Sequence, residues 1–251
     1  MNPPSIPEGP GSVTGAPNLP TGFTGTFTSR YVDTGDLRQH AVTGGEGPPL
    51  LLVHGWPQTW YAWRALMPGL ARDFHVIVPD QRGTGLSGKP PSGYDTATLA
   101  DDLAALMDAL GHQRFAVAGH DTGMWIGCAL AADYPDRVAR LAVAEAAMPG
   151  VSPSPPLFGS FAAYRALDTS IAQNERRKTR RLTLPVLAIG GAEGIGEGAA
   201  NTMKLTGDDV QSMVIPGSGH YCLEEAPEEM VAALTAFLAP YRDEQAAARN
   251  R

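Results

Sequence analysis

Short, continuous apolar runs alternate with helical segments along most of this chain, and this alternation restricts its fold more than any other feature. Such runs are typical of strands that are buried on both faces, and the segments between them carry apolar residues at helical spacing. The order predicts an α/β fold in which helices cover both faces of a mostly parallel sheet. The runs are PPLLLVHG, HVIVPD, RFAVAG, VARLAVAE, LPVLAIGG and VQSMVIPG.

The other predicted elements fit into one large domain. TFTSRYV and LRQHAV alternate in polarity around DTGD, which predicts a hairpin. We expect helices over Trp60–Arg72 and Thr96–Leu110, another between the DTG turn and Pro135, and a C-terminal amphipathic helix in APEEMVAALTAFLAPY. Because ligands bind at the carboxyl ends of parallel strands, the side chains that follow those strands are the candidates for function.

Composition argues against several classes of partner. The chain is 43% hydrophobic and 18% charged, which suits a globular protein, and its net charge of −7 gives no reason to expect nucleic acid or an anionic membrane. No apolar run reaches the length of a membrane span. Residues 1–22 are rich in Pro, Gly and Ser and lack the regions of a secretory signal, so we predict a disordered tail there.

The sequence gives no support for a metal or another cofactor, and we expect none. Cys128 and Cys222 are predicted to be buried free thiols, which is compatible with the reducing cytoplasm where we place the protein. The six histidines are scattered, and none pairs with a cysteine or a carboxylate at the spacing of metal ligands. GTGLSG is not followed by the GK[ST] of a phosphate-binding loop.

The turn GHDTG, at residues 119–123, has the pattern of a nucleophile elbow between a strand and a helix. Its glycines permit a sharp turn and close packing of the strand on the helix. Asp121 then has two interpretations: it is a catalytic nucleophile, or it is only the N-cap of the helix that starts at Thr122.

Three further features favour the catalytic interpretation. VHGWP follows a buried strand, where the backbone N–H groups of Trp56 and Thr122 would form an oxyanion hole. His220 follows the last predicted strand and precedes the last helix, where a general base would face the elbow. The chain order Asp121, Glu145, His220 is the order nucleophile, acid, histidine. Each feature also has a purely structural interpretation: VHGWP is an ordinary turn, His220 is a surface histidine, and Glu145 is a strand-end carboxylate whose oxygens accept from backbone amides.

Together, HGWP, DQRGTGLS, GHDTG and GSGH resemble the α/β-hydrolase superfamily, in particular the epoxide hydrolase and dehalogenase branch with an aspartate nucleophile. The resemblance covers roughly residues 25–150 and 160–240. It implies a cofactor-free enzyme that acts on a small apolar substrate and water. AEAAMPG is similar to a subgroup of bacterial epoxide hydrolases in which Glu145 would orient His220. Many relatives instead place the acid in a later turn, where this chain has Glu193 and Gly194; we favour Glu145.

The resemblance also implies a mechanism. Asp121 would attack a saturated carbon to form an alkyl ester, and His220 would activate the water that hydrolyses it. An epoxide hydrolase needs an acid for the opened ring, and Tyr164 in FAAYRALD is the candidate, although a packing role is an equal alternative. Relatives that act on haloalkanes or fluoroacetate carry tryptophan or arginine after the nucleophile. Thr122 is neither, which disfavours a dehalogenase.

The family's multi-helix lid is shortened in this sequence. We divide the chain into a tail (1–22), a hydrolase core (23–150 and 182–243) and a truncated cap (151–181) with one helix from about Phe161 to Arg181. A short lid would leave Asp121 in an open cleft and reduce turnover, unless a homodimer supplies the missing cover. The alternatives are a dehalogenase or promiscuous esterase on the same triad, and a catalytically silent small-molecule binding protein.

Overall fold

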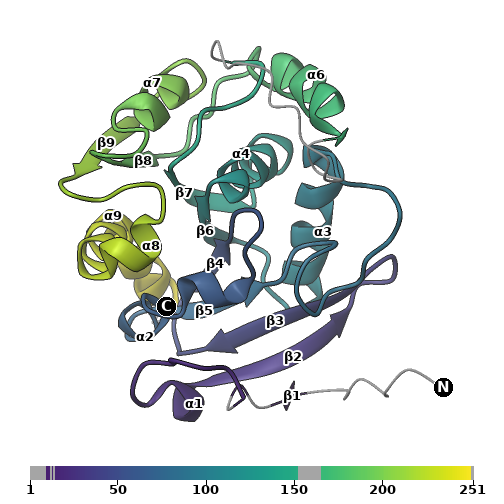
Figure 1. Cartoon of the computed structure of the whole chain (residues 1–251), viewed down its shortest axis with the longest axis vertical. Helices are drawn as coiled ribbons and strands as arrows, with labels where there is room; N and C mark the ends of the chain where they lie inside the picture. The colour runs from purple at the N-terminus through teal and green to yellow at the C-terminus, as the bar shows by residue number, and fades with distance from the viewer. Residues whose placement is uncertain (1–9, 12, 14, 152–164, 250–251) are drawn as a thin grey trace.

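The structure, a computed structural model, describes residues 10–11, 13, 15–151 and 165–249 (Figure 1). Within them, nine strands form one sheet in the order β1-β2-β3-β5-β4-β6-β7-β8-β9. The six from β5 to β9 in this order are parallel, and β1, β2 and β3 add an antiparallel edge. The strands are β1 (Pro10–Gly11), β2 (Phe27–Asp33), β3 (Arg38–Gly44), β4 (Pro49–Val53), β5 (His75–Pro79), β6 (Phe115–His120), β7 (Val138–Ala144), β8 (Val186–Gly191) and β9 (Val210–Ile215).

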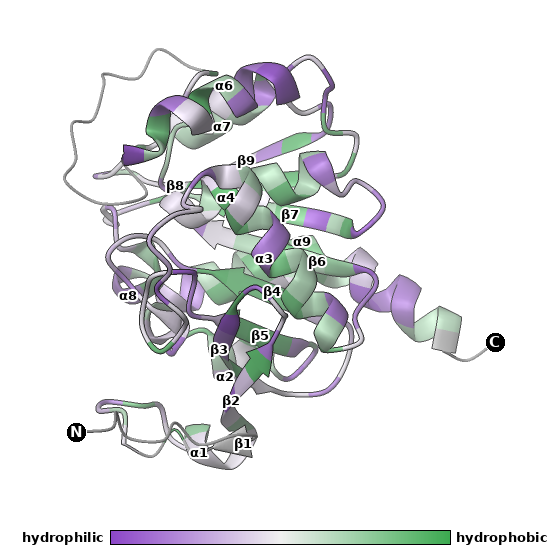
Figure 2. Cartoon of the chain, turned by 90° about the vertical axis from the view of Figure 1, so that its right-hand side faces the viewer, coloured by the Kyte–Doolittle hydropathy of each residue, from purple (hydrophilic) through white to green (hydrophobic). Residues whose placement is uncertain are grey.

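Helices cover both faces of this sheet, as the alternation predicted (Figure 1). Helices α1, α2, α8 and α9 lie on one face with the 3-10 helix η1, and α3, α4, α6 and α7 lie on the other. Figure 2 shows hydrophobic residues concentrated on the central strands, while α6 is largely hydrophilic. The helices are α1 (Phe23–Thr26), η1 (Trp60–Trp63), α2 (Met67–Leu70), α3 (Thr96–Ala109), α4 (Thr122–Asp133), α6 (Leu167–Arg177), α7 (Gly198–Lys204), α8 (Cys222–Glu225) and α9 (Pro227–Arg249).

The order of the strands positions the site. From β4 the chain moves to β5 on one side, and then returns to β6 on the other side and continues outward to β9. The direction therefore reverses between β4 and β6, and loops that leave the carboxyl ends of these two strands diverge around a crevice. The loop after β4 carries Trp56, and the turn after β6 carries Asp121.

Two predicted segments differ from the structure. The helix expected over Trp60–Arg72 is split into η1 and α2, because Pro68 lacks the N–H that a continuous helix would need there. In the described part of the predicted tail, Val13 is only 5% exposed and belongs to the hydrophobic core, and Ala16 and Leu19 pack against it. These three apolar side chains hold the segment on the sheet, unlike the disorder that we predicted for residues 1–22.

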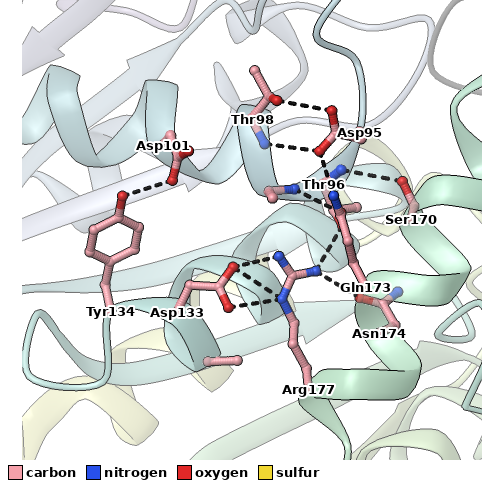
Figure 3. Close-up of polar contacts among 12 residues, drawn as sticks. Asp95, Thr96, Thr98, Asp101, Asp133, Tyr134, Ser170, Gln173, Asn174 and Arg177 are labelled. Atoms are coloured by element: carbon pink, nitrogen blue, oxygen red, sulfur yellow. Dashed lines mark hydrogen bonds and ion pairs between the residues drawn. The ribbon is translucent and has the colours of Figure 1, made fainter.

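Of the predicted cap, the structure describes α6 and its flanks, and α6 is fixed to α3 and α4 by polar contacts (Figure 3). Arg177 forms an ion pair with Asp133 and donates to Thr96 Oγ1 at 2.9 Å. Gln173 donates to Asp95, which also caps α3. The predicted start of this helix, at Phe161, lies outside the described residues.

Candidate active site

Asp121 occupies the sharp turn between β6 and α4 that the GHDTG pattern predicts. Its φ of 54° and ψ of −123° are uncommon for a residue with a side chain, so the surrounding structure must hold the turn in place. Gly119 and Gly123 make this turn possible. A Cβ on Gly119 would lie 2.2 Å from the carbonyl oxygen of Gly123, and one on Gly123 would lie 2.2 Å from that of Val53.

The Asp121 side chain lies against the loop that follows β4, where a Cβ on Gly55 would be 2.5 Å from the Asp121 Cβ. Its Oδ1 accepts a hydrogen bond from the backbone N–H of Trp56 at 3.0 Å, and its side chain is 17% exposed. Thr122, the first residue of α4, is buried and lines the same cavity as Trp56. The two residues that we predicted for the oxyanion hole therefore line one cavity next to the elbow.

His220 lies between Asp121 and Glu145, in the loop after β9. Its Nε2 is 3.6 Å from Asp121 Oδ2, and its Nδ1 is 3.3 Å from Glu145 Oε2. His120, which the sequence analysis did not single out, contacts the carbonyl oxygen of His220 through its Nε2 at 2.7 Å and so helps to hold this loop. The His220 imidazole is 40% exposed, so solvent reaches it.

Glu145 follows β7 and is almost completely buried, with 1% of its side chain exposed. Its carboxylate accepts hydrogen bonds from the backbone N–H groups of Gly191 at 2.5 Å and Ile195 at 3.2 Å. A Cβ on Gly194 would lie 2.5 Å from Glu145 Oε2. Glu145 thus fills the space next to His220 that an aspartate at position 194 would need, whereas Glu193, the alternative acid, is exposed.

The pKa values follow from these contacts. Burial alone would raise the pKa of the Glu145 carboxyl, but hydrogen bonds from His220, Gly191 and Ile195 together hold it below its ordinary value. The hydrogen bond to Glu145 raises the pKa of His220 above 6.5, and the charge of Asp121 adds to this effect against the opposing effect of burial. Burial lowers the pKa of His120.

A cavity of about 180 Å³ adjoins the elbow and contains residues that sequence reasoning missed. Arg82 lines it, but its guanidinium binds both carboxylate oxygens of Asp102, at 2.6 and 2.7 Å, and both side chains are 9% exposed. Tyr94 also lines it, and its hydroxyl donates to the carbonyl oxygen of Pro90 at 2.6 Å. A tyrosine just before a helix gives no signal of function in the sequence.

The remaining candidates are placed as follows. Tyr164 lies outside the described residues. Cys128 and Cys222 are buried free thiols, as predicted, and burial raises the pKa of each to about 12, which leaves them unreactive. Among the residues that the structure describes, no group of three histidine, cysteine or carboxylate side chains could hold a metal ion.

Comparison with known proteins defines the class. The model of the α/β hydrolase fold family matches residues 48–185, which is more than half of the chain, so the chain belongs to this family. A soluble epoxide hydrolase of Corynebacterium sp. is 29% identical over 273 residues, covering 82% of this chain and 95% of the relative. A fluoroacetate dehalogenase of Burkholderia sp. is 43% identical over 124 residues, 47% of this chain and 41% of the dehalogenase.

The fold has close structural counterparts as well. The crystal structure of Cfl2 from Burkholderia cenocepacia is 28% identical in sequence, with a TM-score of 0.83 over 92% of this chain and 99% of that one. The protein is therefore a hydrolase of the α/β fold, as the four motifs predicted. None of the helices in the described part of the chain combines the length and apolar character needed to cross a bilayer.

Proposed function

We propose that this protein is an epoxide hydrolase that acts through a covalent ester on Asp121. One observation carries the proposal: a carboxylate at the elbow is held by the Trp56 amide, 3.6 Å from an imidazole that is itself bound to a buried glutamate. A serine hydrolase needs its histidine to deprotonate the nucleophile, but a carboxylate attacks without that step. His220 is then free to act on water.

The proposed reaction has two steps. One Asp121 oxygen attacks an epoxide carbon, the C–O bond of the ring breaks, and the alkoxide takes a proton from an acid in the pocket. A water molecule that loses its proton to His220 then attacks the ester carbonyl of Asp121. The Trp56 and Thr122 amides stabilise the oxyanion, and Glu145 stabilises the charged imidazole. Collapse breaks the bond between the ester carbonyl and the alkyl oxygen, which leaves as the second hydroxyl of the diol with the proton of the tetrahedral intermediate. Asp121 is again a carboxylate, and the proton on His220 returns to the acid.

The charge of the cavity favours a neutral substrate over a haloacid. A carboxylate substrate would need a cation, but the guanidinium of Arg82 is engaged by Asp102 through both of its carboxylate oxygens. Burial lowers the pKa of His54, so this imidazole is neutral near pH 7. Together with Thr122 in place of tryptophan or arginine, this supports an epoxide rather than a haloalkane or haloacid.

We also propose that the short cap predicted for residues 151–181 gives lower turnover than in relatives with a larger lid. The match to the Corynebacterium enzyme extends over 273 positions, whereas this chain has 251 residues, so the relative has residues without a counterpart here. Less cover would leave more water around Asp121 and weaken electrostatic stabilisation. A second copy of the chain that covers the cleft would restore activity, and turnover per subunit would then rise with protein concentration.

The ring-opening acid has two candidates, Tyr164 and Tyr94. We expect Tyr94→Phe to slow alkylation of Asp121 by an aryl epoxide by roughly 10²–10⁴-fold if its hydroxyl protonates the alkoxide. Single-turnover kinetics measure this rate. Tyr134→Phe is the matched control, since its hydroxyl donates to Asp101 (Figure 3) and neither residue is among the described residues that line the cavity. Equal epoxide rates in Tyr94→Phe and wild type would leave Tyr164.

The pH dependence of turnover should reflect a change in the charge of Asp121. His220 must be neutral to accept a proton, so ester hydrolysis should increase as pH rises through its pKa. In the ester, Asp121 has lost the charge that raises this pKa. The acid limb of kcat should therefore lie at lower pH than the His220 titration in the free protein, measured by NMR. A limb at the same or higher pH would contradict this assignment.

Product analysis tests the proposed function directly. The protein should convert styrene oxide to its diol and release no halide from 1-chlorobutane or fluoroacetate. Halide release would identify a dehalogenase. An increase in melting temperature with the epoxide, without any diol, would identify a binding protein on the hydrolase scaffold.

A further inference from the structure

A second hydrogen-bonded set of serine, histidine and aspartate lies outside the site described above. Ser29 Oγ is 2.8 Å from His40 Nε2, and His40 Nδ1 is 2.8 Å from Asp80 Oδ2. Ser29 lies on β2, His40 on β3, and Asp80 directly after β5. In the antiparallel register Ser29 pairs with Val42, so Ser29 and His40 are diagonal neighbours on the same face of the sheet.

The contacts of Asp80 fix the tautomer of His40. Burial alone would raise the pKa of Asp80, but hydrogen bonds from His40 and the backbone N–H groups of Leu86 and Trp60 hold it below its ordinary value. Asp80 is therefore a carboxylate and only accepts hydrogen bonds, so His40 Nδ1 must carry a proton. In the neutral imidazole Nε2 is then an acceptor, and the Ser29 hydroxyl donates to it. A general base activates a serine in this arrangement.

The set opens on a cavity of its own. This cavity has a volume of about 230 Å³, and none of its described lining residues lines the cavity beside Asp121. Apolar side chains form most of its wall, among them Val42, Trp60 and Leu86. His40 and Asp80 are each 1% exposed, whereas Ser29 is only partly buried, so the nucleophile faces the cavity and its base is shielded.

We propose that Ser29, His40 and Asp80 form a second, acyl-accepting site for small uncharged esters. Ser29 Oγ would bond to the ester carbonyl carbon while its proton moves to His40 Nε2. The C–O bond to the alcohol then breaks, and the alcohol leaves with that proton. A water molecule that gives a proton to His40 then attacks the acyl carbon. The bond between this carbon and Ser29 Oγ breaks, Ser29 takes the proton back from His40, and the carboxylic acid leaves.

Diisopropyl fluorophosphate tests this site without a known substrate. The Ser29 oxygen would displace fluoride from phosphorus, and peptide mapping by mass spectrometry would locate the label. Ser212 is a matched internal control, because it is exposed and bonds the carboxylate of Glu197 but no histidine. We expect Ser29 to be labelled at least about 100-fold faster than Ser212 in the same molecules.

Two variants make the test specific. Ser29→Ala should abolish this label and the release of p-nitrophenol from p-nitrophenyl acetate that depends on it, while epoxide hydrolysis is unchanged. His40→Gln should slow labelling of Ser29 by roughly 10²–10⁴-fold. Equal labelling of Ser29 and Ser212 in wild-type protein, which requires no variant to fold, would overturn the proposal and leave the three residues as a structural link between β2, β3 and β5.

Discussion

Asp121→Ala is expected to lower turnover of an aryl epoxide by at least about 10⁴-fold, the largest loss that we expect from a single substitution, because the proposed ester forms on its carboxylate. The fold should remain, because among the described residues this carboxylate accepts one backbone hydrogen bond, from the N–H of Trp56. The substitution also removes the charge that raises the pKa of His220, so this pKa should fall. Steady-state kinetics and an NMR titration of the imidazole measure the two effects.

The matched control for this variant is Asp73→Ala. Asp73 is also a partly buried aspartate with an ion-pair partner, Arg242. It lies just before β5, and therefore at the opposite end of the parallel strands from Asp121, which follows β6. It should keep wild-type turnover and the wild-type pKa of His220. Residual turnover above about 1% in Asp121→Ala would show that Asp121 is not the nucleophile.

Glu145→Gln is expected to have the second largest effect and to reduce both activity and stability. The two carboxylate oxygens of Glu145 accept hydrogen bonds from the N–H groups of Gly191 and Ile195 and from His220. The amide of glutamine has only one oxygen that can accept. Loss of charge-assisted bonds at this buried site should lower the free energy of unfolding by about 1–3 kcal/mol. Turnover should fall roughly 10²–10⁴-fold, because the imidazole loses its orientation and charge stabilisation. Denaturant unfolding and kinetics test both effects.

A relocated acid distinguishes Glu145 from Glu193. Gly194→Asp alone should be harmful, because its Cβ would lie 2.5 Å from Glu145 Oε2 and would add a second carboxylate there. In Glu145→Ala, the same aspartate has room, and we expect the double variant to exceed Glu145→Ala in turnover by at least about 10-fold. Glu193→Gln should have little effect, since Glu193 is exposed. A large loss in Glu193→Gln would instead identify Glu193 as the acid.

Most of the sheet could be predicted because buried parallel strands leave continuous apolar runs in the sequence. The broken helix after β4 was harder, since its apolar spacing continues across Pro68 and only the missing N–H interrupts it. The packing of Val13 was also missed, because one apolar residue among many prolines and glycines does not reveal that a core lies beneath it. Sequence patterns report local periodicity, whereas these outcomes depend on distant contacts.

In the site, too, some features follow from the sequence and others depend on contacts between distant residues. The order of Asp121, Glu145 and His220 in the chain predicted three side chains that the fold brings together. The sequence could not show that Glu145 fills the space beside Gly194, because that space is formed by the loop after another strand. Tyr94, and the set of Ser29, His40 and Asp80, have no linear motif and become visible only when separate elements meet.

The intact mass of His220→Gln after incubation with styrene oxide tests the covalent mechanism. Glutamine should block hydrolysis of the ester while Asp121 still attacks, so the ester should accumulate. We predict an increase by the full mass of the epoxide, located on Asp121 and absent from the double variant with Asp121→Ala. A folded His220→Gln protein that gains no mass, or an adduct that persists without Asp121, would contradict the covalent mechanism.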